Sequence, residues 1–157
     1  MSFRGTNKVT PPLFVGNPGY TGNIGTVVTN RAYMIPFVLP IAGLPIDLNF
    51  FLGVGGIGNM DIGIYTYAFQ RLWSTGSFAT PAAGAWRTVA YTGSKLQPMS
   101  GFLAMVWDNG TINPKGTSVN VIGGQCCQSG AGSLPLPATL AGVAATAQAP
   151  ACYMRIT

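Results

Sequence analysis

The sequence predicts an all-β fold: a single antiparallel β-sandwich or jelly-roll-like domain with about eight strands and an extended N-terminal arm. Short segments of alternating or β-branched apolar residues recur along the chain, as expected for strands with one buried face. The 157 residues include 22 glycines and 12 prolines, spread over the whole length, which is typical of strands separated by turns. Only residues 141–149 could form a helical turn, and prolines enclose that segment.

Residues 1–23 are interpreted as the arm. They contain Pro11, Pro12 and Pro18 and isolated apolar side chains without a period. A terminal segment of this kind is ordered when something holds it, either a partner or the chain's own sheet. We expect a partner surface, contacted through the apolar and basic side chains of the arm, which are Phe3, Arg4, Lys8, Phe14 and Tyr20.

The sandwich is predicted to occupy residues 24–157. Alternation is clearest at residues 45–52 and 60–67, whereas 74–85 and 123–150 have the composition of loops. Asn109-Gly110 predicts a hairpin turn, and we prefer that interpretation to an N-glycosylation site at Asn109. The expected strands are 24–29, 31–39, 45–52, 60–67, 70–73, 86–91, 102–107, 119–122 and 152–157.

Charge is scarce. Only 7% of the residues are charged, against roughly 25% in a typical soluble domain. We therefore expect partners to cover much of the surface, with self-association into a homo-oligomer. The net charge of +5 comes from bases spread along the chain, which favours acidic partner surfaces over direct nucleic-acid binding. Prolines interrupt the most apolar stretch, 32–58, so we expect no membrane-spanning helix, and the first residues do not predict a signal peptide.

The inventory of reactive side chains argues against an enzyme. The chain has no His and no Glu, and its three acids, Asp47, Asp61 and Asp108, are interpreted as turn or surface residues. We expect no catalytic residue, no cofactor and no metal site. Three cysteines, Cys126, Cys127 and Cys152, are interpreted as small reduced side chains, and one bridge from Cys152 to either of the others stays open.

The three tryptophans allow two interpretations. Trp73, Trp86 and Trp107 could form a stacking platform for a sugar. Aromatic residues at alternate strand positions more often belong to a core or an interface, and we prefer that assignment.

Three segments carry a resemblance to a known class of protein. They are Asp61-Ile62-Gly63-Ile64-Tyr65, the run Arg71-Leu72-Trp73-Ser74-Thr75-Gly76-Ser77, and the turn and strand from Leu96 to Met105. Together they resemble the β-sandwich domains of tailed-bacteriophage virion proteins, over residues 30–157. The sequence departs from the usual pattern at Phe102-Leu103, where Tyr is favoured, and at Met99-Ser100, where Pro-Gly is usual.

The resemblance implies a non-enzymatic virion component, commonly trimeric. Without a heptad or a repeat, the sequence favours a capsid decoration (cement) protein over a fibre shaft. The expected partner is then the major capsid protein or another virion protein, and the expected location is the capsid surface, after assembly in the host cytoplasm. The alternative is a tail or head fibre tip that binds a receptor or a carbohydrate.

Overall fold

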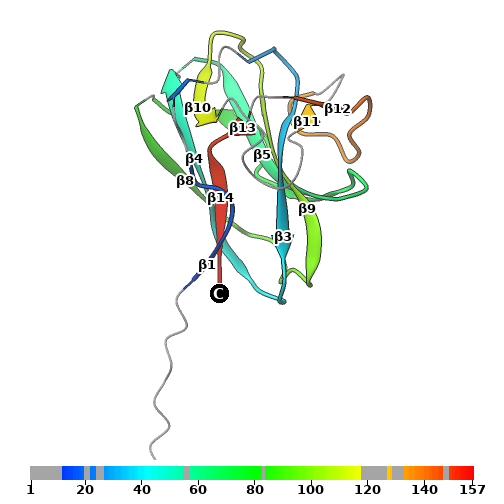
Figure 1. The fold of residues 1–157 in the computed structure, drawn as a ribbon. Helices are drawn as coiled ribbons and strands as arrows, with labels where there is room; N and C mark the ends of the chain where they lie inside the picture. Colours follow the sequence, from blue (N-terminus) through cyan, green and yellow to red (C-terminus); the bar gives the residue numbers. More distant parts are fainter. Residues whose placement is uncertain are drawn as a thin grey trace, which may run out of the picture.

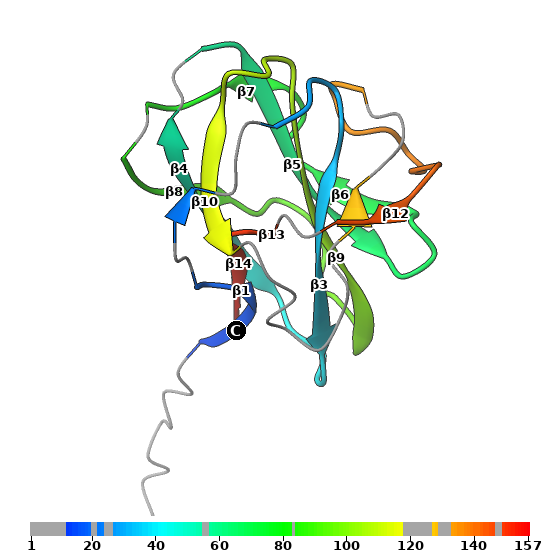
Figure 2. The same ribbon diagram turned by 45° about the horizontal axis from the view of Figure 1, so that its top comes forward.

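The two sheets of the fold face each other in the computed structural model, which confirms the predicted β-sandwich (Figures 1 and 2). The structure describes residues 12–19, 22–23, 27–54, 57–82, 84–117, 127–128, 133–146 and 149–157. Within these ranges every regular element is a strand, and all pairings are antiparallel. Figure 2 separates the two layers, with β4 and β8 in one and β3 and β9 in the other.

The first sheet is built around β4, which pairs on one edge with β14 and on the other with β8. The outer neighbour of β14 is β1. β10 pairs with the last residues of β4, past the point where β14 ends, and also with the short strands β2 and β13. Its strands are β1 (Leu13–Asn17), β2 (Gly22–Asn23), β4 (Pro45–Val54), β8 (Ala85–Ala90), β10 (Asn113–Thr117), β13 (Ala149–Pro150) and β14 (Cys152–Ile156).

The second sheet is built around β9, which lies between β3 and β5. Its order is β12-β11-β3-β9-β5-β6, and β7 pairs with β5. Its strands are β3 (Tyr33–Leu39), β5 (Asn59–Thr66), β6 (Arg71–Ser74), β7 (Phe78–Ala79), β9 (Met99–Trp107), β11 (Cys127–Gln128) and β12 (Ala144–Ala145).

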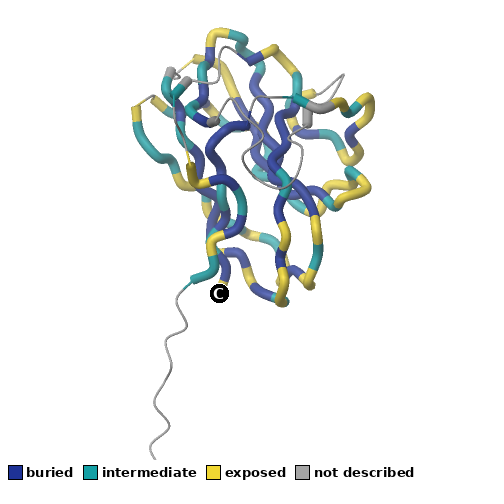
Figure 3. Tube along the Cα trace, viewed as in Figure 1, coloured by how far each residue is buried: buried dark blue, intermediate teal, exposed yellow. Residues whose placement is uncertain are grey.

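The main core lies between the sheets and follows the alternation read from the sequence. Met60, Ile62 and Ile64 of β5 and Leu48 and Phe50 of β4 all point into it and are at most 1% exposed. The predicted alternation of β5 is therefore confirmed. Figure 3 shows the buried residues concentrated along the central strands and the exposed ones at the connections.

The predicted arm is partly a strand of the sandwich. Residues 13–17 form β1, which pairs with β14 and also contacts β3 of the second sheet. Gly16 permits this close approach, because it has a φ of 124° and an added Cβ would lie 2.6 Å from the carbonyl oxygen of Cys152. The sandwich therefore begins at Leu13 and not at residue 24, and the part of the arm held here lies on the chain's own sheet.

Two further local predictions are wrong. Val27 and Val28 lie outside any strand, so the described part of the predicted strand 24–29 is irregular. Asn109-Gly110 does not close a hairpin, because β9 and β10 belong to different sheets. The side chain of Asn109 instead accepts a hydrogen bond from the Thr111 amide (2.9 Å), which stabilises a turn that crosses between the layers. The predicted strand 119–122 lies outside the described residues.

Candidate interaction surfaces

The outer face of the second sheet is covered by residues 134–140, which we call the strap. Leu136 and Leu140 of the strap are buried against Tyr65 and Phe102 in a second apolar cluster. The backbone of the strap is tied down as well. Tyr65 donates its hydroxyl proton to the Pro137 carbonyl (2.5 Å), and the Arg71 amide donates to the Ala138 carbonyl (2.8 Å). The strap is thus an integral layer of the fold.

Asp61 is the polar anchor of the strap. Its side chain is fully buried, and its two carboxylate oxygens accept hydrogen bonds from the Leu136 amide (2.8 Å) and the Thr75 hydroxyl (2.7 Å). The prediction that Asp61 is a turn or surface residue is therefore wrong. A buried carboxylate is tolerated here because hydrogen-bond donors replace the lost water.

Asp47 corrects the same prediction on the first sheet. It is 3% exposed, and it forms an ion pair with Arg155, whose Nε donates to the carboxylate at 2.8 Å. Asn49 donates to the same carboxylate (2.7 Å) and accepts from Thr88 (2.7 Å). The hydrogen bond from Arg155 lowers the pKa of Asp47 below its ordinary value. The acid is therefore satisfied within the fold.

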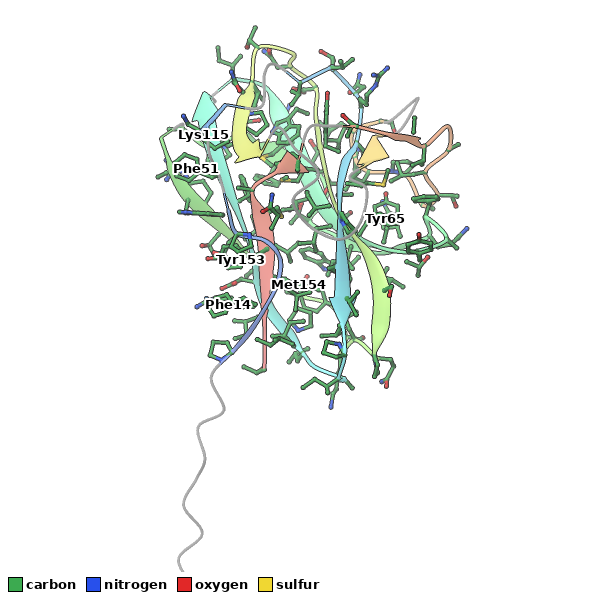
Figure 4. The ribbon with its side chains drawn as sticks, in the orientation of Figure 1. Phe14, Phe51, Tyr65, Lys115, Tyr153 and Met154 are labelled. Carbon is green, nitrogen blue, oxygen red and sulfur yellow. The ribbon has the colours of Figure 1, made fainter. Side chains whose placement is uncertain are left out.

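Aromatic rings lie over this polar chain. Tyr153 contacts Phe14 on one side (ring centroids 5.6 Å apart) and Trp86 on the other (5.2 Å), and Trp86 contacts Phe51 (5.6 Å). We call these four residues the aromatic row. Figure 4 shows Phe14, Tyr153 and Phe51 on the outer side of the first sheet, whereas Tyr65 lies on the far side of the molecule.

The three tryptophans do not form a common platform. Trp107 is fully buried in the main core, Trp73 packs on Tyr91 (ring centroids 4.8 Å apart), and Trp86 belongs to the aromatic row. The assignment of tryptophans to core or interface positions therefore fits the geometry better than a shared sugar site. Sequence reasoning missed the row because its members come from four strands whose register it could not supply.

One end of the sandwich carries four exposed aliphatic side chains that fall within nine consecutive residues, 38–46. Val38 is 66% exposed, Ile41 63%, Leu44 45% and Ile46 41%, and all four lie at the connection from β3 to β4. Leu13, the first residue of β1, lies beside Ile156 at this same end, which is the bottom of Figure 1. We call Val38, Ile41, Leu44 and Ile46 the apolar end. The arm therefore joins the sandwich next to it.

A groove opens at the side of the sandwich between β8 and β7. Its volume is about 560 Å³, and it runs along β8. Phe50, Phe78 and Val89 supply its apolar walls, and Arg87 lies at its border, where the guanidinium donates to the Ala82 carbonyl (2.8 Å). On the opposite side of the molecule β1 contacts β3, so the two sides of the sandwich differ.

Of the remaining predicted site residues, some lie in the described part of the structure and others lie outside it. Phe14 is 56% exposed on β1, whereas Phe3, Arg4, Lys8 and Tyr20 lie outside the described residues. Cys152 is a free, fully buried thiol, and burial raises its pKa. The side chains of the other two cysteines lie outside the described part.

The described ranges contain neither a candidate metal-binding cluster nor a candidate membrane-spanning helix. No cluster of three or more Cys, Asp, Glu or His side chains occurs there that could hold a metal ion. The same ranges contain no helix long and apolar enough to cross a membrane.

Comparison with known proteins adds no relative: no family, no curated protein and no solved structure matches the chain.

Proposed function

We propose that this protein is a non-enzymatic structural component of a tailed-phage virion, a decoration (cement) protein that binds the capsid surface and stabilises the shell. The apolar end is the observation that carries this proposal. Four aliphatic side chains, all within residues 38–46, are exposed to water at one end of a chain with very few charges. A grouped exposed apolar patch marks an interaction site more often than scattered single residues do.

The position of the patch supports docking at a surface. The apolar end is a tip of the sandwich, so contact there leaves both outer faces and the groove accessible for neighbouring copies. Each Å² of apolar surface removed from water stabilises the contact by about 25 cal/mol. Many copies bound in this way would brace the joints of a shell.

The proposal is tested with the exposed pair Ile41→Ser and Leu44→Ser in one variant. Both side chains are at least 45% exposed, so we expect the fold to persist while co-sedimentation with shells of the major capsid protein falls at least tenfold. Ile57→Ser is the matched control, because Ile57 is 60% exposed at the opposite end. Undiminished binding by the double variant would sink the proposal.

A second candidate is a fibre tip that binds a carbohydrate. The aromatic row favours it, because Phe14 exposes 56% of its surface opposite Arg155, its cross-strand partner. Trp86→Ala and Phe14→Ala would then remove binding on a glycan array, with Phe51→Leu as the milder comparison. An array without signal for the unmodified protein excludes this candidate.

A further inference from the structure

β8 is an edge strand with one side open. Within the described residues it pairs with β4 alone. The Tyr91 amide donates to the Ile46 carbonyl, so the odd-numbered residues of this segment direct their backbone groups toward β4. Because the direction alternates in an antiparallel pair, the backbone groups of Thr88 and Ala90 point away from the sheet. An extended segment could hydrogen-bond there and extend the sheet by one strand.

The groove lies directly beside this edge. Thr88 and Ala90 border it, together with the apolar walls Phe50, Phe78 and Val89. An added strand would therefore gain side-chain contacts as well as backbone hydrogen bonds. A large apolar side chain at the right position of that strand would remove Phe78 and Val89 from water, since neither is fully buried in the present structure.

We propose that the occupant is the N-terminal arm of a second copy of this chain, with residues 3–9 added as an antiparallel strand to β8. The segment is free of proline and spans seven residues, which matches the six residues of β8. In an extended conformation Phe3 and Val9 share one side, and Arg4 and Lys8 share the other. The apolar side can then face the groove, while both cations stay in water and away from Arg87.

Chain length requires that the arm comes from another copy. The order β1-β14-β4-β8 places a strand added to β8 four interstrand spacings from β1, which is about 19 Å. Val9 and Leu13 are only four positions apart in the sequence, and four residue steps span at most about 14 Å. The segment between Val9 and Leu13 is therefore too short for the arm to reach the groove of its own chain. The arm of a neighbouring copy is not limited in this way.

This arrangement also predicts the type of assembly. The arm leaves from the apolar end and the groove runs along β8, so donor and acceptor are different surfaces of one chain. Such a heterologous contact closes into a ring when the rotation allows it. The inference goes beyond shell binding and does not require it: the arm joins copies to one another, and docking to a shell is left to the apolar end.

The test uses two full-length variants with complementary defects. Ala90→Pro removes an amide that points into solvent and so blocks the acceptor edge, and proline is tolerated at such an edge position. Phe3→Ser with Val9→Ser weakens the donor and leaves the sandwich unchanged. We expect the unmodified protein to be an oligomer, and each variant alone to run as a monomer of 16.3 kDa in light scattering coupled to size exclusion.

Mixing the two variants is the decisive step. The intact arm of Ala90→Pro can enter the open groove of the arm variant, so we expect a one-to-one heterodimer of twice the chain mass. Ala90→Ser keeps the amide and should remain an oligomer. A monomeric unmodified protein, an arm variant that stays oligomeric, or a mixture without heterodimer would each overturn the proposal. Shell binding is measured separately, so its loss or survival bears only on the function proposed above.

Discussion

The two outer faces of the sandwich are covered in different ways. On the second sheet the strap brings its own backbone, and Asp61, Tyr65 and Arg71 satisfy its polar groups. On the first sheet side chains alone do the covering, with the aromatic row lying over the pair Asp47–Arg155. A covering segment needs a partner for each buried amide and carbonyl. A covering row of rings needs only the correct register between neighbouring strands. It therefore requires no additional hydrogen-bond partners, and a single substitution can remove its contacts.

The largest expected effect lies under the strap. Leu136→Ala should lower the free energy of unfolding by about 2–4 kcal/mol, because the side chain is fully buried and the strap is fixed by hydrogen bonds and cannot collapse into the cavity. Chemical denaturation measures the change. Leu72→Ala, at a side chain that is 47% exposed, should alter stability by no more than about 0.5 kcal/mol. Equal effects at both sites would show that the strap is not part of the cooperative fold.

An intermediate effect is expected in the aromatic row. Tyr153→Leu removes the ring that contacts both Phe14 and Trp86, and each such contact contributes about 0.5–1.5 kcal/mol beyond its buried area. We expect a loss of about 1–2 kcal/mol on thermal or chemical unfolding. Tyr153→Phe preserves the ring and serves as the control. If the control lost as much as the leucine variant, the hydroxyl and not ring packing would hold the row.

The smallest expected effect is a difference in the pH range over which each outer face contributes to stability. Arg155 lowers the pKa of Asp47, so its contribution is present above about pH 4 and is lost as the pH falls through the lowered value. Burial raises the pKa of Tyr65 to about 12, so its contribution is complete below about pH 10 and is lost as the pH rises through about 12.

A plot of the unfolding free energy against pH should fall at both ends, with an acid limb and an alkaline limb. Two substitutions separate the contributions of Asp47 and Tyr65 to these limbs. Asp47→Asn should flatten the acid limb and leave the alkaline limb unchanged. Tyr65→Phe should flatten the alkaline limb and leave the acid limb unchanged. A common response of both limbs to one substitution would contradict the independence of the two faces.

The sequence was sufficient for the strands with a one-sided apolar pattern. Residues 45–52 and 60–67 alternate because one face of each strand lies in the main core while the opposite face also carries polar side chains, and both strands lie where alternation predicts them. Asp47 and Asp61 could not be placed in this way, because their burial depends on Arg155 and Leu136, which are distant in sequence and reach them only through tertiary pairing. Asn109-Gly110 was misread for a related reason: a turn motif does not say whether the next strand stays in the same sheet.

The surfaces were less accessible to sequence reasoning than the fold. The apolar end is local in sequence, at residues 38–46, but its exposure becomes evident only once the sheets are packed. The aromatic row combines Phe14, Phe51, Trp86 and Tyr153 from four strands, and only the pairing registers bring them together. The groove lies beside β8, which pairs with β4 alone among the described residues, and no local sequence pattern encodes this.

The position of β14 has a consequence for synthesis on the ribosome. The central strands of the second sheet, β3, β9 and β5, have all been translated once Trp107 has been added. The first sheet must wait longer, because β14 separates β1 from β4 and is made some 45 residues later. At about 5–20 residues per second this leaves β1 and β4 without their shared neighbour for a few seconds. During that interval the first sheet covers the inner side of the second sheet incompletely, and chaperones have their best opportunity to bind.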